Sequence, residues 1–224
     1  MNRLPKTVKG WKLYKHERGC RIFQDPENPS HFRALADPQE TLRPIADDYA
    51  GWYYSTEPTH YEAVDDEVPD DDDTYISTDP DSAEPELDRF DFPDTSIPAD
   101  ATINWLRICF RARSENDSYR GAVRSYLRTH NTAYWGEVHR PPVSYTDYYE
   151  EYATNPYTGE PWTIYEINSL LAGVHGHSGE QCIGCWLYLY YPVRCTQVYI
   201  LIDYTVAVPV AKKYYGDGLV WIVS

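Results

Sequence analysis

Apolar and polar residues alternate along much of the chain, a pattern that predicts β-strands rather than helices. The clearest case is the run 102–113, in which Leu106, Ile108, Phe110 and Ala112 fall on one face and three arginines fall on the other. The apolar face is therefore predicted to face the core. Short runs of this kind recur between turn residues, which is typical of a β-sandwich or barrel. The predicted strands are 45–55, 60–68, 74–78, 86–92, 102–113, 120–130, 143–152, 185–191 and 194–208.

One segment has the pattern of a short helix. Thr163 and Glu166 have the spacing of a capping box, and Gly173 is placed to end the helix in the left-handed conformation. The apolar stripe of this helix consists of Ile164, Ile167, Leu170 and Leu171. We therefore predict an all-β antiparallel sandwich with one short helix at one end.

The N-terminal segment carries a cation at every third residue. These cations are Arg3, Lys6, Lys9, Lys12, Lys15, Arg18 and Arg21. A period of three favours an extended, polyproline-like ribbon with one charged ridge. Trp11 and Tyr14 lie among the cations, so we interpret the segment as a partner-binding arm, with a solubilising disordered tail as the alternative.

Composition sets the expected domain limits. Residues 24–44 contain four prolines without periodicity, which indicates a linker. We therefore expect an arm and linker at 1–41, a sandwich at 42–208 and a C-terminal strand or tail at 209–224.

Charge is unevenly distributed along the chain. The formal net charge is −15, with about +6 in residues 1–21 and about −21 in the remainder. An acidic body repels phosphates and anionic lipid, so neither nucleic acid nor membrane is an expected partner. No run approaches the roughly 20 apolar residues that a membrane span requires, and no secretory leader is recognisable at the N-terminus.

Five segments together resemble a module that is common in structural proteins of tailed bacteriophages and archaeal viruses, and in some secreted prokaryotic proteins. They are LRPIAD (42–47), HYEAVDDEVPDDDDTYIST (60–78), IPADATI (97–103), TNPYTGEPWTIYEINSLLAGV (154–174) and CTQVYILIDY (195–204). The segment HGHSGEQCIGCW (175–186) departs from the pattern and is expected to be an elaborated loop.

The resemblance implies a jelly-roll-like β-sandwich that serves in head decoration, a turret, a tail or a fibre. It also implies assembly rather than catalysis. The expected protein is a component of a virion, made in the host cytoplasm, or of an extracellular assembly. It is expected to form homo-oligomers and to bind other virion structural proteins.

The densest acidic run is a candidate calcium site, because Ca²⁺ takes six to eight oxygen ligands from carboxylates and carbonyls. The candidate ligands are Asp65, Asp66, Asp70, Asp71, Asp72 and Asp73. The run lacks EF-hand spacing, so a solvated acidic loop is the favoured alternative. A third interpretation is that it receives the basic arm of a neighbouring copy.

A second cluster, of histidines and cysteines, suggests either a metal or a disulfide. His175, His177, Cys182 and Cys185 offer zinc-type ligands, but their spacing is compressed relative to a zinc finger, so zinc is disfavoured. A disulfide between Cys185 and Cys195, or between Cys182 and Cys185, accounts for the same residues. The chain has five cysteines, so at least one thiol stays outside any intrachain pairing.

No motif for a catalytic nucleophile or a phosphate-binding loop is recognisable, and we expect a protein that is not an enzyme. The alternative function is that of a carbohydrate-binding or adhesin module that holds a host-surface glycan on aromatic side chains. Those aromatics are otherwise expected to pack in the core or at subunit contacts. They are Trp52, Tyr53, Tyr54, Trp135, Tyr148, Tyr149 and Tyr152.

Overall fold

The computed structural model describes residues 38–183 and 187–206 in full, together with the backbone of strands nearer the two ends. The chain forms two compact units. The sandwich unit comprises residues 40–96 and 105–202, and the terminal unit comprises 1–39, 97–104 and 203–224. Each unit is described below by itself.

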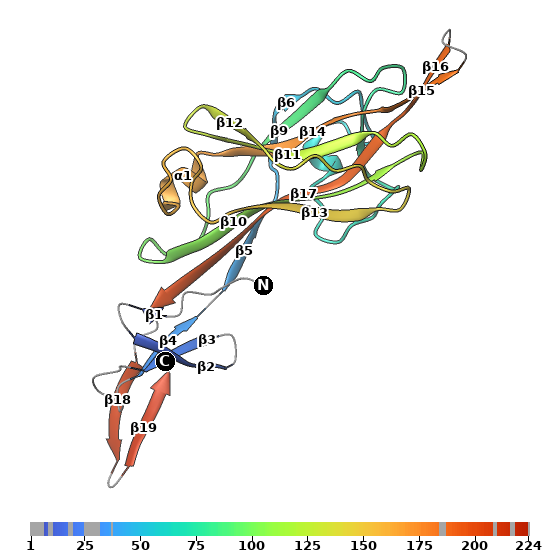
Figure 1. The fold of residues 1–224 in the computed structure, drawn as a ribbon. Coiled ribbons are helices and arrows are strands. Elements are labelled where there is room, and N and C mark those ends of the chain that lie inside the picture. Colours follow the sequence, from blue (N-terminus) through green and yellow to red (C-terminus); the bar gives the residue numbers. More distant parts are fainter. Residues whose placement is uncertain are drawn as a thin grey trace. The chain divides into compact units, whose positions relative to one another are not determined.

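Two antiparallel sheets make up the sandwich unit (Figure 1). One sheet has the order β13-β10-β17, with β5 and β8 also paired to β17 and β7 paired to β8. The other has the order β12-β11-β14-β9-β6. The strands are β5 (Gln39–Leu42), β6 (Ala46–Ala50), β7 (Tyr54–Ser55), β8 (Ile76–Ser77), β9 (Glu86–Asp91), β10 (Thr102–Ser114), β11 (Ala122–Thr129), β12 (Thr132–Trp135), β13 (Thr146–Tyr152), β14 (Leu171–His177), β15 (Gly179–Ile183), β16 (Leu187–Tyr191) and β17 (Val193–Ala207).

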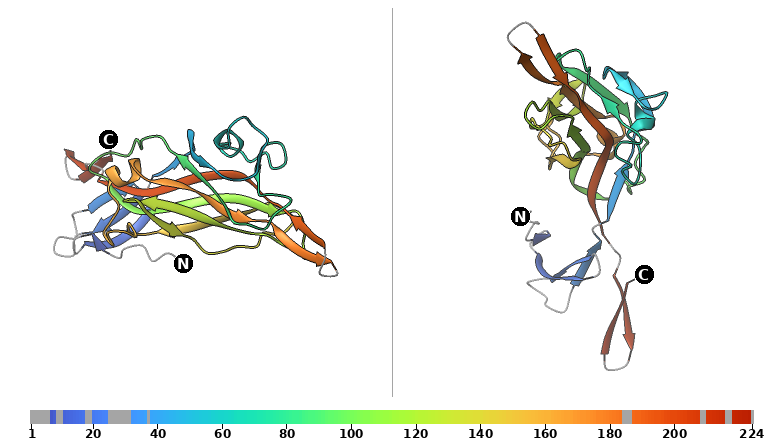
Figure 2. Two further views of the ribbon diagram at one scale, coloured as in Figure 1. Left: turned by 90° about the horizontal axis from the view of Figure 1, so that it is seen from above. Right: turned by 90° about the vertical axis from the view of Figure 1, so that its right-hand side faces the viewer.

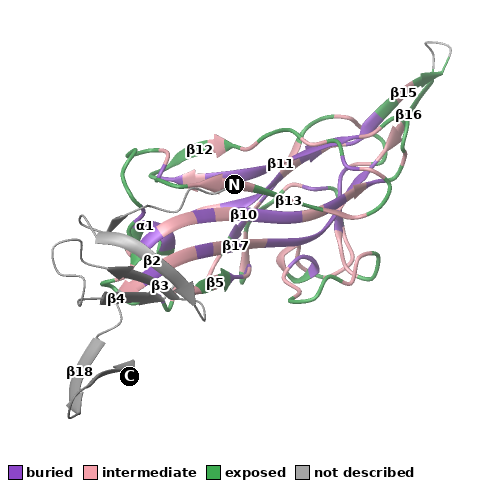
Figure 3. Ribbon diagram, turned by 60° about the horizontal axis from the view of Figure 1, so that its bottom comes forward, coloured by how far each residue is buried: buried purple, intermediate pink, exposed green. Residues whose placement is uncertain are grey.

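The chain passes repeatedly from one sheet to the other, since β8, β9, β10 and β11 lie alternately in the first and second sheets. The two layers are seen from two further directions in Figure 2, and their buried residues in Figure 3. Side chains from both sheets fill the space between them, as sandwich geometry requires. The main core cluster is Trp52, Ala63, Val64, Ile76, Phe90, Phe110, Ala112, Val123, Val174, Val193, Cys195 and Val198.

The predicted all-β sandwich is confirmed, and its most regular strand behaves as its pattern indicates. Leu106, Ile108, Phe110 and Ala112 of β10 are each at most 1% exposed. The alternating residues therefore select the face of β10 that the core covers, with a hydrophobic contribution of about 1.5–3 kcal/mol for each large side chain.

The one α-helix of the described residues, α1 (Ile164–Asn168), also begins as predicted. The Thr163 side chain accepts a hydrogen bond from the Glu166 backbone N–H, and the Glu166 carboxylate accepts one from the Thr163 backbone. The prediction that Gly173 ends this helix is wrong, because Gly173 lies within β14. A Cβ atom at Gly173 would lie 2.0 Å from the Asp88 carbonyl oxygen, so the close approach of β9 explains the glycine.

Several other local predictions are wrong. The segment 60–68 is not a strand: it contains the 3-10 turn η1 (Tyr61–Ala63) and a loop. Strand β12 was not predicted, and it follows β11 through a two-residue turn in which His130 and Asn131 have φ of 50° and 59°. Both residues must adopt positive φ for a tight turn of this kind. The segment 175–186 is not merely a loop, since β14 and β15 cover most of it.

Strands also form in the terminal unit, which was predicted to contain an arm and a linker. Strands β1 (Thr7–Val8), β2 (Trp11–Glu17), β3 (Cys20–Gln24) and β4 (Phe32–Ala36) pair antiparallel in sequence order. The expected polyproline ribbon is therefore wrong for β2 and β3, because polyproline has no interstrand hydrogen bonds. The expected linker contains β4 and β5, and β18 (Val210–Tyr215) and β19 (Gly218–Val223) form a hairpin.

Within the described part of the chain, no helix has the length and apolar character needed to span a membrane.

Candidate interaction surfaces

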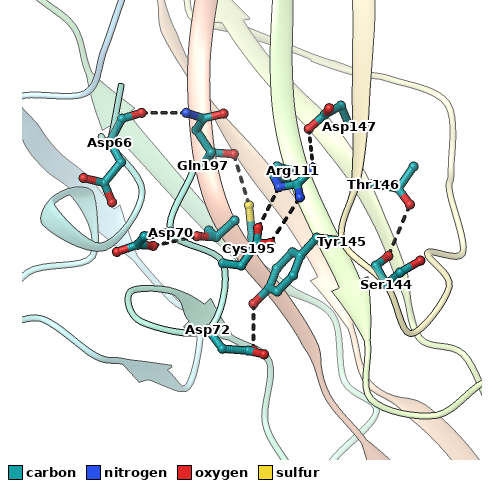
Figure 4. A network of polar contacts seen from close by, with 12 residues as sticks. Asp66, Asp70, Asp72, Arg111, Ser144, Tyr145, Thr146, Asp147, Cys195 and Gln197 are labelled. Atoms are coloured by element: carbon teal, nitrogen blue, oxygen red, sulfur yellow. Dashed lines mark hydrogen bonds and ion pairs between the residues drawn. The ribbon is translucent and has the colours of Figure 1, made fainter. Parts of the chain in front are cut away.

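The acidic run lies against the outer face of the β13-β10-β17 sheet, where arginines neutralise two of its carboxylates. Arg111 Nε lies 2.7 Å from Asp71 Oδ1, and Asp72 Oδ1 lies 3.0 Å from both Arg113 Nη2 and Arg194 Nη1. Asp71 adopts a left-handed φ of 59°. Figure 4 shows Asp72 and Arg111 in this network. The run is thus tied to its own sheet by charge-assisted hydrogen bonds.

Threonines and a glutamine hold the rest of the acidic loop. The Thr74 hydroxyl donates to Asp70 at 2.9 Å, the Thr196 hydroxyl donates to the Thr74 carbonyl at 2.8 Å, and Gln197 Nε2 donates to the Asp66 carbonyl at 2.6 Å. No group of three or more His, Cys, Asp or Glu side chains among the described residues is placed to hold a metal ion. The six candidate calcium ligands are therefore not gathered into one coordination site.

The pKa values of two carboxylates in this loop are shifted in opposite directions. Burial alone would raise the pKa of Asp72, but the charges of Arg113 and Arg194 and hydrogen bonds from Arg194 and Tyr145 lower it overall. Burial and the neighbouring Asp66 raise the pKa of Asp65. Arginine pairing therefore fixes the charge of Asp72, as expected for a carboxylate between cations.

The histidines and cysteines of the second cluster that the structure describes do not gather into a metal site. His175 and His177 lie in β14, Cys182 is exposed in β15, and Cys195 is fully buried in β17. Cys182 and Cys195 are both free thiols, so neither proposed disulfide is formed; Cys185 itself lies outside the described residues.

Burial keeps the Cys195 thiol protonated. Its side chain belongs to the core, and its Sγ donates to the Gln197 carbonyl at 3.4 Å. Burial raises the pKa of this thiol to about 12, so it behaves as a small apolar side chain.

A buried carboxylate that the sequence analysis missed connects β9 of the second sheet to the segment that follows β6. Asp88 is fully buried and accepts hydrogen bonds from the backbone N–H groups of Gly51 at 2.6 Å and Trp52 at 2.8 Å. His60 Nδ1 lies 2.6 Å from its other oxygen. Asp88 shares a strand face with Phe90, and an acidic residue on an apolar face is the signal that could have revealed it.

The aromatic residues considered for sugar stacking separate into two groups. Trp52 is 3% exposed in the core, and Tyr148 stacks on Phe110 with ring centroids 5.4 Å apart. Tyr152 is only partly exposed. Exposed positions are occupied by Tyr53, Tyr54, Trp135 and Tyr149.

Strands β15 and β16 form a separate two-stranded sheet that projects beyond the ends of the neighbouring strands (Figures 1 and 3). Ile183 pairs with Leu187, and Leu189 shares their face because side chains alternate along a strand. All three are exposed, with Leu187 the most exposed at 56%. We call Ile183, Leu187 and Leu189 the apolar hairpin face.

The side chains of the basic segment, from Arg3 to Arg21, lie outside the described residues, so their partner-binding role stays a prediction. No protein-family model matches the chain, and no curated protein matches it. The two-sheet antiparallel β-sandwich is thus the class that the fold defines.

Proposed function

We propose that this protein is a structural component of a virion that assembles through the apolar hairpin face and the basic N-terminal segment. The apolar hairpin face is the observation that carries the proposal. A two-stranded hairpin by itself is marginally stable in water, and grouped exposed aliphatic side chains are typical of interaction surfaces. Packing against a neighbouring subunit would bury these side chains and stabilise the hairpin.

Charge supports the same interpretation. The first 21 residues carry about +6 and the rest of the chain about −21, so the basic segment of one copy complements the acidic surface of another. The resemblance of residues 42–205 to viral structural modules supports a virion as the setting.

Sedimentation velocity of the full chain tests the assembly step. The double variant Leu187→Asp/Leu189→Asp should weaken self-association by about tenfold or more, because each aspartate replaces a leucine whose burial contributes about 1.5–3 kcal/mol. Val68→Asp is the matched control, since Val68 is 76% exposed and lies outside the hairpin. A wild-type chain that stays monomeric, or a double variant that associates like wild type, would count against the hairpin as the contact.

The virion setting needs a separate test. Quantitative mass spectrometry of particles purified from the source of this chain should find the protein at a fixed ratio to the major shell protein. Its absence from such particles would reject the virion assignment while leaving the assembly result unchanged.

A further inference from the structure

The outer face of the five-stranded sheet carries a row of side chains that crosses all five strands. Trp135, Tyr126, Gly173, Arg89 and Tyr49 are successive cross-strand partners from β12 to β6. Gly173 contributes no side chain, which leaves the row open at its centre. Trp135 and Tyr49, at its two ends, are 43% and 51% exposed. The face therefore presents separated aromatic rings rather than a closed apolar layer.

Arg124 lies beside this row and differs from the arginines of the other sheet. Its guanidinium carbon is 4.5 Å from the centre of the Trp135 ring, and its Nε donates to His175 Nδ1 at 3.4 Å. Arg107 and Arg111 each pair with carboxylates, at 2.7 Å in both cases. Arg124 makes no ion pair within the described part of the chain. In a protein of net charge −15, such a cation is available for an anionic ligand.

His175 holds Arg124 in position. Burial, together with the charge of Arg124, lowers the pKa of His175 to about 4, so the ring is neutral and Nδ1 can accept the Nε–H. Stacking on Trp135 and this hydrogen bond fix the guanidinium plane. The terminal Nη groups are then left to bind a carboxylate, the planar anion that matches an arginine fork.

Two depressions meet at His175. One, of about 390 Å³, is lined by Tyr49, Glu86, Arg89, Trp135 and His175 among others. The second, of about 210 Å³, is lined by Arg124, His175 and residues of β11 and β14. A single elongated ligand that fills both depressions would contact the aromatic rings with one part and Arg124 with another.

The sheet geometry restricts how a ligand can bind at the two depressions. Strand β14 pairs with β11 on one side and β9 on the other, so its backbone offers no free edge to an added peptide strand. Recognition must come from side chains. Exposed aromatic rings with a few polar groups suit the mixed apolar and hydroxyl faces of a sugar.

We propose that this face binds a carboxylate-bearing saccharide, with Arg124 on the carboxylate and Trp135 against the sugar ring. This is a ligand-binding role in addition to assembly. It does not depend on the hairpin contact.

Isothermal titration calorimetry of the full chain with trigalacturonate and with sialyllactose tests the proposal. The neutral counterparts are the methyl esters of the same two sugars. At least one acidic sugar should bind, and its neutral counterpart should bind about tenfold or more weakly, because a hydrogen bond between charged groups is lost. Equal binding of the neutral sugar, or no binding of either acidic sugar, would overturn the proposal.

Variants locate the site. Arg124→Gln should weaken binding of the acidic sugar about tenfold or more. The affinity of Arg124→Lys should lie between those of wild type and Arg124→Gln, since lysine keeps the charge but loses the planar fork. Arg128→Gln is the matched control, because Arg128 lies on the same strand face and donates to Asn131. Thermal melts establish that each variant is folded.

Two outcomes of the variant series would contradict the site. The first is an equal loss of affinity for the acidic sugar in Arg124→Gln and Arg128→Gln, which would indicate that the overall charge of the face, and not Arg124 itself, binds the sugar. The second is displacement of the sugar by an acidic peptide of sequence 65–73 that binds more tightly, which would favour a protein ligand instead.

Discussion

Replacing Asp88 by alanine is expected to destabilise the sandwich by about 3–5 kcal/mol. The fully buried carboxylate accepts two backbone hydrogen bonds, from Gly51 and Trp52, and contacts His60 at 2.6 Å. Each buried N–H that loses its acceptor costs about 1–3 kcal/mol. The loss of the His60 partner adds to this cost.

Asp88→Asn separates the shape of the side chain from its charge. The amide oxygen can still accept from the two backbone N–H groups, so we expect a smaller loss of about 1–2 kcal/mol. Asp91→Ala is the control, since Asp91 is exposed on the same strand and should change stability by no more than about 0.5 kcal/mol. The free energies come from urea unfolding followed by tryptophan fluorescence. A loss below about 1 kcal/mol for Asp88→Ala would refute this reasoning.

The pH dependence gives a second measurement of the same network. Burial alone would lower the pKa of His60, but the hydrogen bond and charge of Asp88, with the charge of Asp47, raise it above 6.5. The pair therefore stabilises the fold fully below pH 6.5, and this stabilisation is lost as pH rises through the folded pKa. Asp88→Asn should weaken that decline. An unchanged slope would show that another group causes it.

Three further predictions concern other positions. Burial, with the charges of Asp79 and Asp88, raises the pKa of Glu86 to about 7, so this residue makes stability fall as pH rises from 4.5 to about 7. Glu86→Gln should remove that fall. In urea unfolding above pH 7 it should stabilise the protein by only about 0.5–1 kcal/mol, because the side chain is partly exposed and screened. A variant without this gain would contradict the raised pKa of Glu86. Gly173→Ala should cost about 2 kcal/mol or more in the same assay, since its Cβ would lie 2.0 Å from a carbonyl oxygen, and a neutral result would refute the close strand contact. Alkylation followed by peptide mapping should label Cys182 in the native protein and Cys195 only after unfolding, and equal native labelling would show that Cys195 is accessible.

Local patterns predicted the parts of the fold that depend on neighbouring residues. Alternation over 102–113 indicated the core face of β10, and the spacing of Thr163 and Glu166 indicated the start of α1. In both cases the signal depends on residues that are only two or three positions apart in the sequence. The sandwich class could therefore be predicted without long-range information.

Contacts between distant segments explain what the sequence did not predict. Strand β14 contains three glycines or alanines among its first six residues, and its extended form depends on pairing with β11 and β9. The acidic run was recognised as a candidate site, but its arginine partners lie on strands up to 122 residues away. Asp88 was missed because its hydrogen-bond donors belong to a loop 36 or 37 residues earlier.

The ion pair between Asp72 and Arg194 has a consequence for the order of folding. The two residues are 122 positions apart, so the acidic loop, which also pairs with Arg111 and Arg113 of β10, cannot complete its native contacts until β17 has been synthesised and paired. Contacts of such long sequence separation slow folding, because the closure of a long loop precedes their formation. Until β17 is in place, part of the loop's negative charge lacks its native partner, and repulsion between the loops of incomplete chains opposes their association.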